Sequence, residues 1–147
     1  MPKFGKLSTK NLSECDPRLQ KVFDEVIKNY DCSIICGHRE ESIQNYLYSI
    51  ERTQLQFPNG KHNSKPSMAV DAIPYPVVLP NRKTRPETYE KDLGRLYYFA
   101  GYVIATALQM EIKIKFGGDW NMNNNFLDNN FDDLFHFELI VSRQINK

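Results

Sequence analysis

The chain has 147 residues, which fits one domain long enough to bury roughly two-thirds of its unfolded surface in a single core. Its 41% hydrophobic and 25% charged residues are ordinary for a globular protein and exclude a disordered or fibrous chain. With 19 basic residues, 18 acidic residues and a net charge of +1, it has no charge excess favouring nucleic acid or a membrane surface.

The N-terminal sequence predicts a protein made in the cytoplasm. Residues 1–17 lack the continuous apolar stretch of a secretory signal. No run in the chain approaches the roughly 18 apolar residues of a membrane helix. We therefore expect neither a signal peptide nor membrane insertion.

The first predicted elements are a helix and a strand. Asp16 followed by Pro17 is typical of an N-cap and a first helical residue. Apolar residues then recur at helical spacing through Ile27. A short apolar run from Cys32 to Cys36, closed by Gly37, predicts a buried strand.

Three cysteines, Cys15, Cys32 and Cys36, are an odd number. Strand alternation places Cys32 and Cys36 on one face, and their spacing differs from that of a redox or zinc-knuckle pair. We expect free, buried thiols rather than a disulfide or a metal pair.

The middle of the chain predicts two helices separated by a loop and a strand. A second helix is expected at about Glu40 to Ile50, with three apolar residues facing inward: Ile43, Leu47 and Ile50. Residues 57–66 have a loop composition, and residues 68–73 resume an extended apolar pattern. Four prolines among residues 74–86 exclude a helix there and indicate a surface excursion.

A third and central helix is expected from about Pro86. Its apolar positions run for several turns and are Leu93, Leu96, Tyr97, Ala100, Ile104, Ala107 and Leu108. Gly94 and Gly101 are expected to permit close packing against a sheet.

The C-terminal part predicts two strands around an asparagine-rich loop. Residues 112–116 alternate as in a half-exposed strand, and residues 121–130 contain six asparagines, typical of a surface loop. Whether a second ion such as calcium binds this loop stays open. In the last strand His136 and Glu138 share one face, opposite Phe135 and Phe137.

The whole pattern predicts a single small α+β domain over residues 1–147, with about three helices on a mostly antiparallel sheet.

Four residues point to a metal site with a catalytic base. His62, Asp71 and His136 form a ligand set that zinc accepts, and three protein ligands leave a fourth position open for water, as hydrolysis requires. Asp133, three residues before His136, is the candidate general base, since a nearby carboxylate can take a proton from water and pass it to the leaving amine. Glu138 is an alternative base or a support for His136.

Two other side chains are candidates for contact with substrate. Arg39 follows the buried strand and is expected to project into a cleft, where it would stabilise an oxyanion or bind a carboxylate. Trp120 is either a packing residue or a cleft wall. Strand alternation directs His38 away from Arg39, so we do not expect it to be a ligand.

Blocks of sequence covering almost the whole chain resemble a family of zinc peptidases. They are FGKLSTKNL with DPRLQKVFDEVI, GHREESIQNYLY, KHNSKPSMAVDAIPYP, and KFGGDWN with DDLFHFELI. The family is that of D-Ala-D-Ala carboxypeptidases and dipeptidases, and the closest branch is that of phage L-alanyl-D-glutamate endopeptidases (endolysins).

The resemblance implies zinc bound by His62, Asp71 and His136 in an open cleft, Asp133 as general base, Arg39 at the oxyanion or substrate, and Gln44 as a recurring substrate-site glutamine. Two positions depart from the pattern. Gly60 stands where many relatives have serine, and Phe135 stands where the endolysin branch commonly has proline. Neither departure removes a ligand.

The sequence therefore predicts a monomeric zinc peptidase that cleaves peptidoglycan stem peptides at the L-Ala-D-Glu bond, without a separate cell-wall-binding domain. It would be made in the host cytoplasm and reach the wall after membrane disruption. A D-Ala-D-Ala carboxypeptidase or dipeptidase is the nearest alternative. The alternative that is not an enzyme is a non-catalytic zinc-containing cell-wall-binding module.

Overall fold

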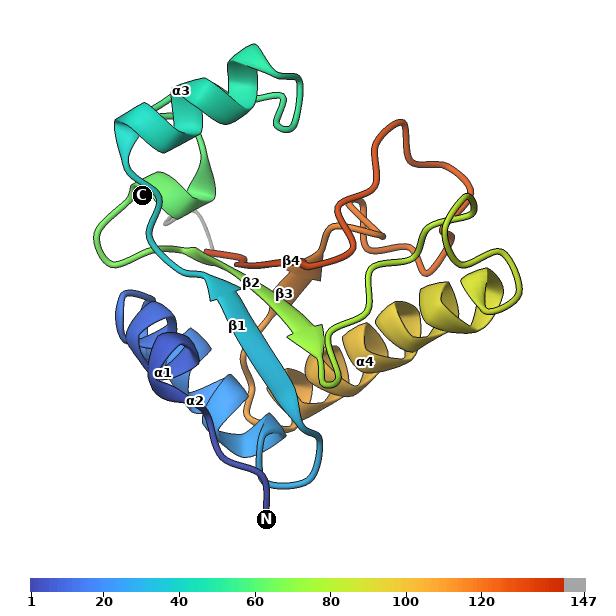
Figure 1. The fold of residues 1–147 in the computed structure, drawn as a ribbon. Helices are drawn as coiled ribbons and strands as arrows, with labels where there is room; N and C mark the ends of the chain where they lie inside the picture. The colour runs from blue at the N-terminus through green and yellow to red at the C-terminus, as the bar shows by residue number, and fades with distance from the viewer. Residues whose placement is uncertain (142–147) are drawn as a thin grey trace.

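The structure is a computed structural model, and the residues that it describes are 1–141 (Figure 1). Within this range it is an α+β domain, and the predicted fold class is confirmed. The helices are α1 (Lys6–Ser13), α2 (Pro17–Val26), α3 (Glu41–Ser49) and α4 (Tyr89–Gln109), with a short 3₁₀ helix η1 (Lys61–Asn63). The strands are β1 (Cys32–Cys36), β2 (Ala69–Pro74), β3 (Ile114–Phe116) and β4 (His136–Leu139).

The sheet is antiparallel throughout, in the order β1-β2-β4-β3. Because side chains alternate along a strand, each strand sends one set of residues to each face. Val70 and Phe137, which are register partners, point into the hydrophobic core. Asp71 and His136, the next pair in the register, therefore lie together on the opposite face.

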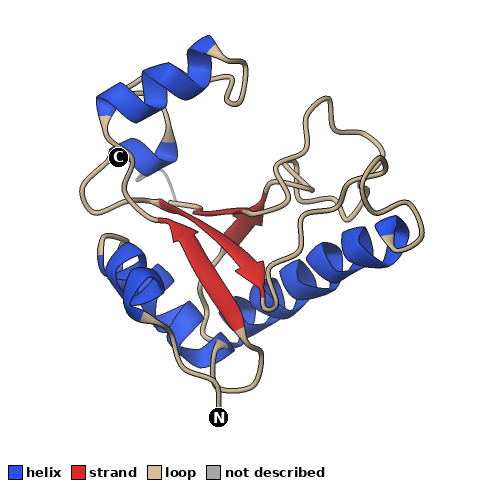
Figure 2. Ribbon diagram, viewed as in Figure 1, coloured by secondary structure: helices blue, strands red, loops and turns tan. Residues whose placement is uncertain are grey.

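Helices α1, α2 and α4 cover the core face of the sheet (Figure 2). The predicted first helix is confirmed as α2, and the Asp16 side chain caps it by accepting from the Arg18 backbone N–H at 2.9 Å. Helix α1 was not expected. Its buried residues are Ser8 and Leu12, so it lacks the repeated apolar positions that indicate a helix in a sequence.

Helix α3 forms at the predicted place but does not bury the predicted face. Ile43 and Ile50 are 52% and 45% exposed, so the inward orientation expected for them was wrong. The buried side chain of α3 is Gln44. The reason is that α3 lies away from the core, at the top of Figure 1, and is held by polar contacts to the segment that follows it.

Helix α4 starts at Tyr89 rather than near Pro86, and its buried face is rotated from the predicted one. Leu108 is 60% exposed, while Phe99 and Val103 are fully buried. Gly94 and Gly101 have open space where a side chain would project, so close packing at these glycines was wrong. An almost continuously apolar helix leaves its orientation undetermined until its partners are known.

Candidate metal centre and cleft

The structure brings the predicted donors His62, Asp71 and His136 together on the face of the sheet opposite the hydrophobic core, where all three are buried. His62 Nε2 lies 3.2 Å from Asp71 Oδ1 and 3.3 Å from His136 Nδ1. His136 Nδ1 lies 3.4 Å from the same Asp71 oxygen. The three atoms thus form a nearly equilateral triangle.

Two strands and a 3₁₀ helix place these donors. Asp71 on β2 and His136 on β4 are opposite each other in the antiparallel register. His62 lies in η1, which is tied down by backbone hydrogen bonds from Arg39 N to His62 O (2.8 Å) and from Met68 N to Lys61 O (3.1 Å). The loop histidine is therefore held against the strands by residues before and after it.

The donor triangle fits a zinc ion. Zinc bound at about 2.0–2.1 Å with tetrahedral angles keeps its ligand atoms about 3.3 Å apart. The far nitrogen of each histidine is engaged: His62 Nδ1 lies 2.7 Å from Gly37 O and His136 Nε2 lies 3.0 Å from Glu138 Oε1. With the outer nitrogens engaged in this way, the facing nitrogen of each ring is the one that offers its lone pair to a metal once the imidazole is neutral.

The charges of the donors are strongly coupled. Burial opposes the charged form of His62, yet the Asp71 carboxylate raises the pKa of His62 to about 10. Burial likewise opposes ionisation of Asp71, but His62 and His136 lower its pKa. Buried charges of opposite sign hold each other in the ionised form. A metal ion must displace the shared protons in order to bind.

Asp133 lies beside this triangle. One of its oxygens is within 4.8 Å of the donor atoms of Asp71 and His136. Burial, reinforced by the negative charge of Asp71, raises the pKa of Asp133. Its backbone N–H donates to Gly117 O at 2.8 Å, and a Cβ on Gly117 would lie 2.1 Å from Asp133 O. Glycine at 117 is therefore required for Asp133 to approach the site.

Glu138 contacts the outer nitrogen of His136 and lies on the side away from the donor triangle. Burial disfavours its charge, but the hydrogen bond from His136 and the charges of His136, Lys115 and Lys61 lower the pKa of Glu138. This position suits support of the histidine and not proton transfer at the triangle.

Arg39 and Gln44 form a polar network under the metal centre. The Arg39 guanidinium donates to Asp71 Oδ2 and to Gln44 Oε1, both at 3.2 Å. The Gln44 amide donates to Leu55 O at 2.6 Å, and its oxygen also accepts from Asn63 at 3.2 Å. Gln44 is only 1% exposed, so its hydrogen-bonding groups are used within the protein.

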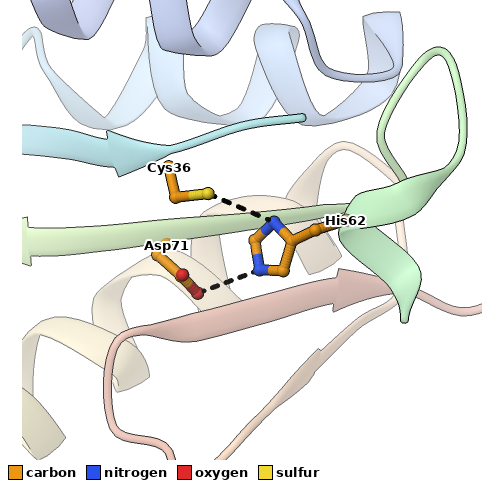
Figure 3. Close-up of side chains that lie close together, drawn as sticks. All are labelled: Cys36, His62 and Asp71. Atoms are coloured by element: carbon orange, nitrogen blue, oxygen red, sulfur yellow. Dashed lines mark hydrogen bonds and ion pairs between the residues drawn. The ribbon is translucent and has the colours of Figure 1, made fainter. Parts of the chain in front are cut away.

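Cys36 lies behind His62 and not inside the donor triangle. Its Sγ is 3.9 Å from His62 Nδ1, the nitrogen that also meets Gly37 O (Figure 3). Asp71 approaches the opposite nitrogen of the ring. Cys36 and Asp71 therefore face different atoms of His62. All three cysteines are free thiols, as predicted. Cys15 and Cys32 are buried, but Cys36 is only partly buried, so the burial predicted for it was wrong.

The metal donors open into a cleft of about 510 Å³. One wall is formed by α3 and the segment after it, with Leu47, Arg52, Leu55 and Lys61 among its residues. The other wall is formed by the asparagine-rich loop, with Trp120, Asp128, Asn129 and Phe131. Trp120 donates through Nε1 to Phe131 O at 2.6 Å, and its ring stacks on the ring of Phe131. The ring centroid of His136 lies 5.5 Å from that of Trp120.

Sequence reasoning missed Arg52, Lys61 and the loop residues 128–131 as parts of the cleft. Nothing in their local pattern distinguishes them from a solvated surface. Arg52 and Lys61 follow α3, which ends at Ser49, and the chain reverses at Glu51, a residue with a left-handed backbone (φ 60°). The Arg52 N–H then bonds to Leu47 O at 2.8 Å, as in a Schellman motif.

Two histidines and two carboxylates at the floor of an open cleft, on a small α+β scaffold, are the arrangement of a hydrolase that works with a metal ion. A family model described as phage L-alanyl-D-glutamate peptidase matches residues 1–140, and the chain belongs to that family. The predicted family and the general function, a peptidase acting on peptidoglycan, are confirmed at this level.

A solved structure supports the same fold. The L-Ala D-Glu endopeptidase ChiX of Serratia marcescens superposes with a TM-score of 0.64 and 21% sequence identity, over 94% of this chain and 90% of that one. No curated protein sequence matches the chain. No helix among residues 1–141 is long and apolar enough to cross a membrane.

Proposed function

We propose that this protein is a zinc-dependent endopeptidase that hydrolyses the L-Ala-D-Glu bond of peptidoglycan stem peptides, as an endolysin. The observation that carries the proposal is the donor triangle of His62, Asp71 and His136, in which both histidines turn a lone pair inward. Membership of the phage peptidase family supports the choice of bond.

His62, Asp71 and His136 would hold the zinc ion, which would supply Lewis acidity to a carbonyl and make water more acidic. Asp133 is the general base. It takes a proton from the attacking water and returns it to the leaving amine. Its half-buried position beside Asp71 favours this role because a raised pKa brings a carboxylate closer to working pH.

We assign Arg39 two tasks. It fixes the orientation of Asp71, and it presents positive charge at the cleft where the carbonyl oxygen becomes negative. For Gln44 we propose positioning instead of the substrate contact expected from the sequence, since its amide joins Arg39 to Leu55. Trp120 forms part of the substrate wall.

We also propose that the protein acts as a monomer, is made in the host cytoplasm, and reaches the wall after the membrane is disrupted.

A carboxypeptidase acting on D-Ala-D-Ala shares this metal chemistry, so product analysis has to separate the two functions. Purified peptidoglycan should be incubated with the zinc-loaded protein and the products identified by mass spectrometry. New D-Glu amino termini are expected. Release of D-Ala would show that the D-Ala-D-Ala bond is cleaved instead of the proposed one. No cleavage would overturn the proposal.

The base is tested by Asp133→Asn, which keeps the size of the side chain. We expect zinc content to remain unchanged and kcat to fall by about 10²- to 10⁴-fold. The matched control is Asp132→Asn, at the exposed neighbouring position, which should retain full activity. Full activity of the Asp133 variant would show that another group is the base.

A further inference from the structure

The two walls of the cleft carry charges of opposite sign. Arg52 and Lys61 are the cationic lining residues on the side of α3, and that wall has no acidic lining residue among residues 1–141. Asp128 and Asp133 lie on the other side, and Glu138 lines the cleft beside His136. A substrate with an acidic part and a neutral part would therefore bind in one direction.

Arg52 and Lys61 are available to a ligand. Neither makes an ion pair with any residue in the described range 1–141, and both are exposed. Arg39, the third cation of the cleft, is already engaged by Asp71. Asp128 on the opposite wall accepts hydrogen bonds from Asn121 and Asn123, at 3.1 and 2.6 Å. Among the cations that line the cleft, Arg52 and Lys61 are thus the two without an ion pair in the described range, and both lie on the side of α3.

The position of this charge relative to the metal centre is fixed by the chain. Lys61 immediately precedes the donor His62 in η1, and its charge reaches Glu138 beside His136. Arg52 is held by the reversal after α3, and Gln44 ties Leu55 to the same helix. The two cations thus line the same cleft as the candidate donors, each on a backbone held by hydrogen bonds.

The substrate class in the proposed function has an acidic residue directly at the scissile bond. A glutamate residue, whether linked through its α- or its γ-carboxyl group, keeps one carboxylate outside the peptide backbone. That carboxylate lies within one residue of the bond to be cleaved. L-alanine on the other side of the bond carries no charge.

We propose that Lys61 and Arg52 form a carboxylate subsite that binds the free carboxylate of the D-Glu residue after the scissile bond. The subsite rests on the proposed function and gives it a direction: the acidic part of the stem lies along the α3 wall. The L-Ala side, which leads to the glycan, lies along the wall of Trp120 and Phe131. The subsite selects a free carboxylate over its amide at this residue.

The test uses two synthetic peptides that differ at one group, N-acetyl-L-Ala-γ-D-Glu-L-Lys with the free α-carboxylate and the same peptide with that carboxylate amidated. The wild-type chain should prefer the free acid in kcat/KM by about 10- to 100-fold, the factor expected for a hydrogen-bonded charge. Lys61→Gln and Arg52→Gln should each raise KM for the acid, with kcat and zinc content nearly unchanged. The double variant should lose the preference.

Lys65→Gln is the matched control, because Lys65 is an exposed lysine of the same loop and does not line the cleft. It should keep the wild-type preference. Equal losses on both peptides in the Lys61 and Arg52 variants, or an unchanged preference, would overturn the subsite while leaving the proposed function intact. Cleavage of neither peptide by the wild-type chain would overturn the proposed function and the subsite with it.

Discussion

At the scale of single residues, the metal centre depends on which nitrogen of each histidine faces inward. His62 uses Nε2 and His136 uses Nδ1, because Gly37 O and Glu138 occupy the other nitrogens. The sequence identified both histidines, but the ring orientation comes from partners 25 residues away for His62 and 2 residues away for His136. Of these two partners, only Glu138, the partner of His136, could be recognised from the local sequence.

Glu138→Gln tests this orientation. A neutral amide supports the His136 ring less well, so we expect zinc affinity to fall by about 10- to 100-fold. Competition with a chromophoric chelator measures the affinity. Glu87→Gln, at an exposed position far from β4 in the sequence, is the control. At saturating zinc the Glu138 variant should still hydrolyse substrate; if it is inactive when fully loaded, Glu138 and not Asp133 is the base.

The thiols give a second prediction at this scale. Burial raises the pKa of Cys15 and of Cys32 to about 12 in each case. Because the thiolate is the reactive form, both residues should resist iodoacetamide at pH 8 in the folded protein and react after unfolding in urea. Peptide mass spectrometry of the two samples measures this. Rapid labelling of either residue in the native protein would contradict its burial.

At the scale of elements, sequence reading succeeded where a residue pattern and its packing partner coincide. Helix α2 and strands β2 and β4 follow their apolar periodicity, because each lies directly on the core. It failed for α3, whose apolar residues face solvent, and for the buried face of α4. In both helices the partner, and not the local pattern, decides which side is buried.

The start of α4 is fixed by an ion pair that can be tested. Arg85 Nε donates to Asp92 Oδ2 at 2.7 Å, and the Thr88 hydroxyl donates to the same oxygen at 2.8 Å. The hydrogen bond from Arg85 lowers the pKa of Asp92 below its ordinary value. A carboxylate of this kind stabilises the fold above its unfolded pKa of about 3.9, and the contribution is lost as the pH falls through the folded pKa.

Asp92→Asn should therefore lower the Tm of the metal-free protein at pH 7, and the difference from wild type should shrink below about pH 4. Thermal unfolding followed by circular dichroism over this pH range measures it. Asp24→Asn, at an exposed position of α2, should show no such difference. A difference that grows on acidification would argue against the ion pair as the cause.

At the scale of the whole molecule, the metal centre connects distant parts of the chain. Its donors come from η1, β2 and β4, between residues 62 and 136. A ligand that binds only the folded state stabilises it by an amount that grows with the logarithm of the free ligand concentration relative to its Kd. Free zinc at 1,000 times its Kd should thus add about 4 kcal/mol to the free energy of unfolding.

Thermal unfolding with added zinc, and again with excess EDTA, checks this expectation. The Tm should rise with zinc and return to the metal-free value with the chelator. His136→Ala should show no rise, because the triangle has lost one donor. An equal rise in this variant would mean that zinc binds elsewhere.

The sequence was sufficient to identify the family, and it nominated His62, Asp71, His136 and Asp133 as candidate site residues, because both depend on residue types in local motifs that can be recognised without knowledge of the fold. It also determined the elements whose apolar faces lie on the core. Only the tertiary structure decided the inward nitrogens, the exposed face of α3, the engagement of Arg39 and Gln44, and the two walls of the cleft. These features arise from contacts between segments far apart in the chain, and local patterning carries no information on such contacts.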